Sequence, residues 1–192
     1  TAIDQSTDTC TNNFCTLNSL APSLQTLSEG NLVVTQSGYA TTIATIGFNT
    51  GKWYWEIKNT NQVGDTQNVG IINETALSGG LTGYGPGTNA NGWGYYIQSN
   101  SDNGKSFHNN TTSSVYQTVS VNDIISIAVD ADAGKIWWGV NGTWVNSGNP
   151  ATGANAQYTN VSTNQLLFPA TDCRNSGVEA FNFGSPPYAI SS

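Results

Sequence analysis

Ten short runs of β-branched and aromatic residues, separated by clusters of Gly, Asn, Asp and Ser, constrain the fold of this chain more than any other feature. Strands of globular proteins have this length and composition. Helical spacing occurs only in 18–28, where Leu20, Leu24 and Leu27 recur, and Pro22 limits that helix to about two turns. The pattern predicts an all-β sandwich or barrel. The expected strands are 31–35, 39–48, 52–58, 68–72, 92–98, 114–119, 123–130, 135–140, 166–170 and 178–184.

Alternation of apolar and polar side chains assigns faces within these strands. In the sequence KWYWEIK (52–58), Trp53, Trp55 and Ile57 point to one side, and Glu56 points to the other. The first three side chains are therefore expected in the core, and Glu56 in solvent. By the same alternation the predicted core also takes Ile125, Ile127, Val129, Ile136, Trp138, Val140, Phe181 and Phe183.

Turn residues connect the strands of the second half into a meander. DADAG (130–134) is a tight hairpin connection, and Asn141-Gly142 is the strongest short hairpin signal in the chain. Residues 123–145 are therefore expected to form three antiparallel strands. The polar stretches 73–91 and 146–164 are predicted loops, and loops of that length usually carry binding or contact surfaces.

Charge is scarce in this chain, whose 192 residues are the length of one domain. Twelve acidic residues stand against five basic ones, a net charge of −7, so cations are too few to neutralise the phosphates of a nucleic acid. The longest apolar run, 124–129, has the length of a strand rather than of a membrane span. Polarity comes instead from Asn, Thr, Ser and Gly, a composition typical of secreted proteins, envelope proteins and viral appendages.

Residue types that carry catalysis or bind metals form no recognisable pattern in the sequence. No pair of carboxylates has the spacing that a glycosidase needs, and the only histidine, His108, lies in a predicted loop. Residues 130–134 begin like an oxygen-ligand calcium loop, but Ala133 and Lys135 stand where further ligands would be needed. The chain is therefore expected to be no enzyme and to bind no metal or cofactor.

Three cysteines, Cys10, Cys15 and Cys173, are an odd number and lack the paired spacing of a zinc site. They form either one disulfide with a remaining thiol, or three reduced thiols. In an oxidising compartment, a bridge from Cys10 or Cys15 to Cys173 would pin an N-terminal arm to the end of the chain. A local bridge between Cys10 and Cys15 is equally compatible with the sequence.

Five aromatic residues lie in loops, at strand ends or on the face opposite the core set, where amphipathic rings can bind a sugar or a partner protein. The alternative is that the long loops or a neighbouring subunit bury them. Three of the five flank the Gly-rich loop 79–92 and are expected to form a contact at the rim. The predicted binding residues are these three, Tyr84, Trp93 and Tyr96, together with Trp137 and Trp144.

A series of motifs resembles the SPRY domain, in order and spacing, from residue 31 to residue 188. The resemblance implies a bent, concanavalin-like jelly roll, a sandwich of two antiparallel β-sheets whose rim loops bind and which has no catalytic apparatus. Residues 1–30 are then an N-terminal arm with a short helix, and 189–192 are a tail. The motifs are GKWYWEI (51–57), VGI (69–71), GWGYY (92–96), DIISIAVDADAGKIWWGVNGTW (123–144), FPA (168–170) and EAFNFGSPPY (179–188).

Two segments resemble the SPRY-like domains of bacteriophage structural and tail proteins in particular. They are IWWGVNGTW (136–144), with NSGNPATG (146–153) after it, and the opening STDTCTNNFCTLNSL (6–20). Cys10 and Cys15 depart from that phage pattern, in which other small residues are expected. The departure hints that these two cysteines pair with each other or with Cys173.

Composition and resemblance together predict a non-enzymatic structural or recognition protein on the outside of a phage particle, either decorating the capsid or associated with the tail. Its partners would be other virion subunits, copies of itself in a homo-oligomer, or host-surface glycans, with no nucleic acid and no membrane. The alternative is an extracellular subunit that assembles into fibres through the arm, 1–30. The expected location is the virion surface or the extracellular medium.

Overall fold

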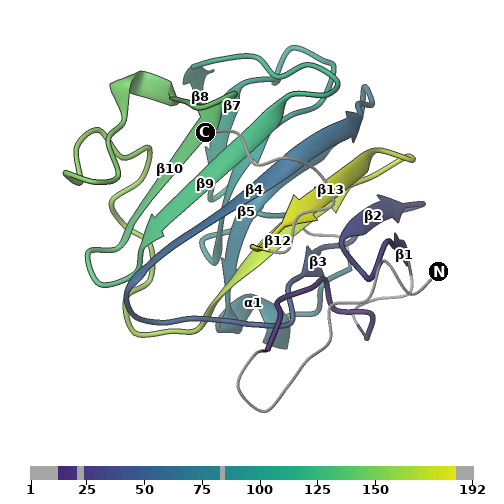
Figure 1. Cartoon of the computed structure of the whole chain (residues 1–192), viewed down its shortest axis with the longest axis horizontal. Coiled ribbons are helices and arrows are strands. Elements are labelled where there is room, and N and C mark those ends of the chain that lie inside the picture. The colour runs from purple at the N-terminus through teal and green to yellow at the C-terminus, as the bar shows by residue number, and fades with distance from the viewer. Residues whose placement is uncertain (1–12, 21–23, 83–84, 185–192) are drawn as a thin grey trace.

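Two antiparallel β-sheets pack face to face in the computed structural model of the chain, which describes residues 13–20, 24–82 and 85–184 (Figure 1). The all-β sandwich that the sequence predicts is confirmed. One sheet contains, in spatial order, β1 (Gln25–Ser28), β2 (Val33–Gln36), β13 (Val178–Asn182), β4 (Lys52–Asn61), β9 (Ile124–Asp130), β10 (Lys135–Val140) and β11 (Thr143–Trp144). The other contains β3 (Thr42–Ile43), β12 (Leu167–Cys173), β5 (Gln67–Asn73), β6 (Gly92–Tyr96), β7 (Lys105–His108) and β8 (Thr111–Val115).

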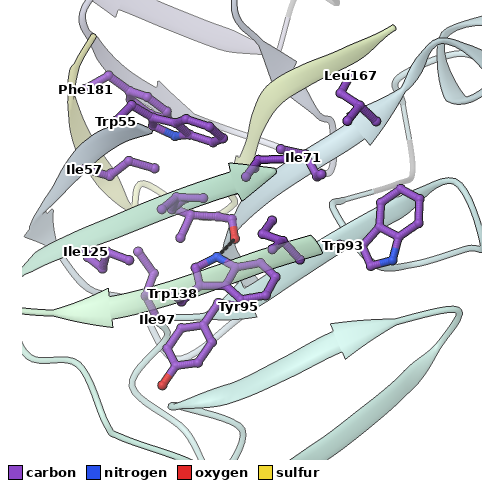
Figure 2. Close-up of a cluster of buried hydrophobic side chains, with 14 of the residues drawn as sticks. Trp55, Ile57, Ile71, Trp93, Tyr95, Ile97, Ile125, Trp138, Leu167 and Phe181 are labelled. Atoms are coloured by element: carbon purple, nitrogen blue, oxygen red, sulfur yellow. Dashed lines mark hydrogen bonds between the residues drawn. The ribbon is translucent and has the colours of Figure 1, made fainter. Parts of the chain in front are cut away.

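Aromatic and β-branched side chains from the two inner faces form the core between the sheets (Figure 2). Trp55 and Ile57 of β4 are buried there, as the alternation predicts. Trp138 of β10 joins the sheets directly, because its indole N–H donates a hydrogen bond to the Val69 carbonyl of β5 at 3.2 Å. The Tyr95 ring of β6 stacks on Trp138 with 5.9 Å between ring centroids. The remaining predicted core residues Ile125, Ile127, Val129, Ile136, Val140 and Phe181 are also buried, and Phe183 packs against the core.

The predicted meander over 123–145 is confirmed as β9, β10 and β11, which pair in sequence. In the first turn, the Asp130 carboxylate accepts a hydrogen bond from the Ala133 N–H at 2.9 Å. In the second turn, Asn141 and Gly142 both have positive φ angles, 50° and 77°. A two-residue hairpin turn needs that conformation, which explains the Asn-Gly pair.

Two side chains of β4 depart from the expected burial. Trp53, predicted in the core, is 42% exposed, and its ring stacks on the buried Phe48 with 4.8 Å between ring centroids. Glu56, predicted in solvent, is fully buried on the outer face of the sheet. The Tyr54 hydroxyl donates to Glu56 Oε1 at 2.6 Å, and Asn182 Nδ2 of β13 donates to Oε2 at 3.4 Å. A hydrogen-bond partner on the neighbouring strand β13 thus helps to bury Glu56, and alternation within β4 alone does not reveal it.

Part of the stretch expected as an N-terminal arm packs with the sandwich. Leu17 is fully buried, and its N–H donates to the Asn31 carbonyl at 2.9 Å. The helix expected over 18–28 is wrong in its described part, since β1 pairs with β2 and places Leu27 opposite Val34. Cross-strand hydrogen bonds outweigh the helical spacing of the leucines, because helix propensity is a weak preference that tertiary context overrides.

Two short helices were not predicted. In α1 (Glu74–Ser78), the side chain of Asn73 caps the N-terminus and accepts from the Ala76 N–H at 3.2 Å. A single 3₁₀ turn, Val145–Ser147, follows β11. None of the helices in the described ranges is long and apolar enough to cross a membrane.

Candidate functional site

The predicted rim residues of β6 lie inside the molecule, and this corrects their expected exposure. Trp93 is 1% exposed, stacks on His108 with 4.9 Å between ring centroids, and donates from Nε1 to Asn160 Oδ1 at 3.3 Å. Tyr96 is 9% exposed and stacks on Phe107 of β7 with 4.9 Å between ring centroids. The third predicted rim residue, Tyr84, lies outside the described residues.

Glycines explain why that loop covers the sheet instead of standing free at its rim. A Cβ atom on Gly94 of β6 would lie 2.3 Å from the Pro86 carbonyl oxygen, and one on Gly87 would lie 2.3 Å from the Phe107 carbonyl oxygen. Only glycine permits an approach this close between two backbones. Residues 86 and 87 of the predicted binding loop are therefore packed closely against β6 and β7.

Trp137 and Trp144 lie at the outer face of the seven-stranded sheet, where a third ring, Tyr54, joins them. Trp144 is half-buried, but Trp137 is only 1% exposed, which corrects its expected accessibility, because the segment after β11 packs on it. Strand register places Tyr54 beside Ala128 and Ala128 beside Trp137, so a small side chain separates two aromatic ones. Trp144 approaches Tyr54 edge-on, with 6.3 Å between ring centroids. These rings border a hollow of about 240 Å³, the first hollow, which Pro150 and Ala151 close at one side.

A second hollow, of about 200 Å³, lies beside the first, and Trp53 and Tyr54 line both. We call these two residues the aromatic ridge. Phe48, Cys15 and Phe183 contribute to the wall of the second hollow. The described segments 13–20 and 180–184, from opposite ends of the chain, thus meet at one side of the ridge.

The ridge is exposed although its residues are large and apolar. Trp53 is 42% and Tyr54 50% exposed. Among the residues that the structure describes, they are the only aromatic side chains in the exposed large hydrophobic set, whose other members are Leu20, Val115, Val121 and Leu166. Exposed aromatic clusters beside concave surfaces are frequent binding sites for other proteins.

Hydrogen bonds within the protein hold the rings of this site. Trp53 Nε1 donates to the Thr50 carbonyl at 2.7 Å, and Trp137 Nε1 donates to the Ala154 carbonyl at 2.8 Å. The Tyr54 hydroxyl donates to Glu56, and burial together with that bond raises the pKa of Tyr54 to about 12. The rings are therefore held in place before any ligand arrives, and the two exposed ones, Trp53 and Tyr54, present ring surface instead of free donors.

Charged groups at the border of the first hollow are also engaged within the protein. Lys52 Nζ lies 3.6 Å from Asp130 Oδ2, and Lys135 Nζ donates to the Gly153 carbonyl at 2.9 Å. No group of three or more His, Cys, Asp or Glu side chains that could hold a metal occurs within the described ranges. The arrangement around the ridge is suited to binding by apolar contact.

A model of the SPRY domain family matches residues 52–186, more than half of the chain. The chain belongs to the SPRY family. The expected jelly-roll sandwich is the fold of that family, and the matched segment includes the ridge and both tryptophans of the first hollow. A comparison with curated proteins gives no match.

Solved SPRY structures share the fold of this SPRY domain at low sequence identity. The SPRY domain of human HERC1 matches with a TM-score of 0.66 and 15% identity, over 88% of this chain and 98% of that one. The PSpry domain of TRIM65 gives the same TM-score and identity, over 88% of this chain and 91% of that one. Stonustoxin matches with a TM-score of 0.63 and 19% identity, over 88% of this chain and 27% of its own.

Sequence reasoning placed two of the five predicted residues of this SPRY domain, Trp137 and Trp144, at the first hollow, but missed the ridge. Trp53 was assigned to the core and Tyr54 only to the opposite face. A signal for Tyr54 existed, since alternation puts it and Trp137 on outer faces of their strands. Recognising the site also needed the pairing of β4 with β9 and of β9 with β10, which is tertiary information.

The cysteines of this SPRY domain are free where the structure describes them. Cys15 is half-buried beside the second hollow, and Cys173 is fully buried in the core. Burial raises the pKa of both thiols, most strongly that of Cys173. Cys10 lies outside the described residues, so a pairing that involves it stays a prediction.

Two buried carboxyl groups lie away from the ridge. Burial raises the pKa of Asp172 to about 8, against the attraction of the Arg174 guanidinium, which lowers it. Burial raises the pKa of Glu179 to about 8 as well, against hydrogen bonds that lower it. Alternation within strands did not predict the burial of either residue.

Proposed function

We propose that this SPRY domain is a non-enzymatic docking module that binds an extended, uncharged segment of another protein across the aromatic ridge. The observation that carries the proposal is the exposed pair Trp53 and Tyr54 between two apolar hollows. SPRY domains generally act as protein–protein interaction modules, which supports this class of function. Rigid aromatic side chains beside a pocket are also the residues that contribute most to protein interfaces.

The partner proposed is a subunit of a phage particle on whose outside the domain is displayed, either on the capsid or at the tail. Support comes from the sequence: the segments 6–20 and 136–153 resemble phage SPRY-like domains. The surface also suits display outside a cell, since only 9% of the residues are charged and Asn, Thr and Ser supply the polarity.

A host-surface glycan is a less suitable ligand for this site. Sugars bind through stacking on aromatic rings together with hydrogen bonds to their hydroxyl groups. The N–H groups of Trp53 and Trp137 and the hydroxyl of Tyr54 already have partners within the protein. A sugar would therefore lose water hydrogen bonds without replacing them at these rings, which is costly. An apolar protein segment has no such loss.

Association with purified particles tests the proposal. The tagged domain is expressed in cells that produce the particles, and its co-sedimentation with them is measured for three variants. Trp53→Ala removes half of the ridge, and Ala151→Arg places a long cation in the first hollow. Ala90→Arg adds the same cation at an exposed position of the loop over the other sheet.

We expect wild type and Ala90→Arg to co-sediment with the particles, and the two ridge variants to remain in the supernatant. Absence of the wild-type domain from particles would refute the virion setting. Equal association of Trp53→Ala and Ala151→Arg with wild type would refute the ridge as the docking surface. Circular dichroism of each variant checks that the fold is retained.

A further inference from the structure

We infer that the segment bound across the ridge makes its contacts through prolines, with one pyrrolidine ring in each hollow. The inference rests on the proposed docking function and adds the chemical class of the partner. It follows from three properties of the site: the hydrogen bonds already made by its rings, the two hollows beside one ridge, and the paired charges at its border.

Hydrogen bonding limits which peptides can be buried on the ridge. A backbone N–H that is removed from water needs an acceptor, because nearly all buried N–H groups in proteins are paired. The Tyr54 oxygen is held between Glu56 Oε1, at 2.6 Å, and Ser126 Oγ, at 3.2 Å. The indole groups of Trp53 and Trp137 carry donors only, and both donors are already used.

Proline avoids this loss, since it has no backbone N–H. Its ring is apolar and can lie flat on an aromatic face, and its φ angle is fixed before binding, so little conformational entropy is lost. An ordinary extended strand would instead bring backbone N–H groups to a ridge whose two aromatic side chains offer them no free acceptor. The ridge therefore favours proline over aliphatic residues of similar size.

The shape of the site agrees with this chemistry. Aromatic-lined grooves bind proline-rich segments in the polyproline II conformation, in which ring after ring enters successive slots. Here the first hollow, about 240 Å³, and the second hollow, about 200 Å³, lie on the two sides of Trp53 and Tyr54. Both are large enough for a side chain and are lined mainly by apolar residues.

The charges of the domain limit which segments can bind at the ridge. The two charged side chains that line the first hollow, Lys52 and Asp130, lie 3.6 Å apart and face each other as an ion pair. The domain carries a net charge of −7, which repels acidic segments at long range. We therefore expect a partner segment without acidic residues, in which prolines stand among small polar residues.

Peptide titration tests the inference with the whole chain. The probe is a ten-residue peptide in which Pro-Pro pairs alternate with single serines, capped at both ends. A matched peptide carries valine in place of each proline, and cellohexaose serves as a sugar probe. Binding is measured by calorimetry and by tryptophan fluorescence for wild type, Trp53→Ala, Ala151→Arg and the control Ala90→Arg.

We expect the proline peptide to bind wild type and Ala90→Arg equally, and to bind Trp53→Ala and Ala151→Arg at least about tenfold more weakly. Cellohexaose and the valine peptide should bind more weakly than the proline peptide by a similar factor.

Equal, ridge-dependent binding of the valine peptide would overturn the preference for proline and leave the docking surface in place. Proline-peptide binding that Trp53→Ala does not weaken would overturn the location. Ridge-dependent binding of cellohexaose in place of peptide would overturn both the inference and the proposed function. Absence of proline-peptide binding up to about 1 mM would overturn the inference alone, since particle association decides the proposed function separately.

Discussion

The Thr171 hydroxyl of β12 donates a hydrogen bond to the Glu179 carboxyl group of β13, and this bond crosses between the two sheets of the sandwich. Glu179 is fully buried, and its Oε1 atom has no partner among the described residues. A charged carboxylate at this place would be poorly stabilised, and burial accordingly raises the pKa of Glu179 to about 8 from 4.5.

Stability should therefore fall as pH rises from about 4.5 to about 8. In this range the folded state keeps the Glu179 proton that the unfolded chain has released, so raising the pH favours unfolding. Asp172 acts in the same direction, because its pKa is raised from 3.8 to about 8. We expect the free energy of unfolding to be higher at pH 5 than at pH 8.5, by on the order of a few kcal/mol, and the urea midpoint to be higher accordingly. A midpoint that rises across this range would contradict the assignment.

Replacement of Asp172 by asparagine should separate its share of this effect. The amide has the shape of the protonated carboxyl group but cannot ionise, so Asp172→Asn should match wild type near pH 4 and exceed its stability at pH 8.5. The control Glu29→Gln makes the same type of replacement at an exposed carboxylate. Urea unfolding at both pH values measures the difference. A loss of stability at pH 8.5 would show that the Asp172 charge is needed.

Gly70→Ala should destabilise the domain severely. A Cβ atom at this position of β5 would lie 1.9 Å from the Trp93 carbonyl oxygen of β6, so the two central strands would have to separate. Overpacking of this kind costs about 3 kcal/mol. Gly64→Ala is the matched control, since its Cβ atom would meet only Ser99 Oγ, at 3.7 Å. Urea unfolding compares the variants, and equal stabilities would mean that β5 and β6 do not approach as described.

Trp138→Phe should destabilise the core through two losses. The smaller ring leaves a cavity beside Tyr95, and the Val69 carbonyl loses its hydrogen bond from Nε1. The combined cost is about 3 kcal/mol. Trp144→Phe, at the half-buried edge of the sheet, should cost less than about 1 kcal/mol. Thermal or urea unfolding measures both, and an equal effect of the two replacements would rule out a special role for Trp138.

Alternation of apolar and polar residues predicted the burial of several side chains correctly. It placed Trp55 and Trp138 in the core because successive side chains of any strand point to opposite faces, a property of the backbone alone. The Asn141-Gly142 turn was equally predictable, since few residue pairs adopt two positive φ angles. The motif series identified the family for the same reason, because its residues recur at fixed places in the strands.

Which segments pack on each face of a strand depends on the tertiary structure. Trp53 is exposed and stacks on the buried Phe48, whereas Trp93 and Tyr96 are buried and stack on His108 and Phe107 of β7. Burial of Glu56 depends on Tyr54 and on Asn182, a residue far along the chain.

The sequence by itself thus determined the SPRY fold and most of its strands, since these follow from local geometry and from patterns within single strands. It missed β1 and β7, and it expected strands over 39–48 and 114–119 where the structure has β3 (Thr42–Ile43) and β8 (Thr111–Val115). Only the tertiary structure decided where the binding surface lies. Exposure of an aromatic ring depends on the segments packed over it, and those segments come from distant parts of the chain.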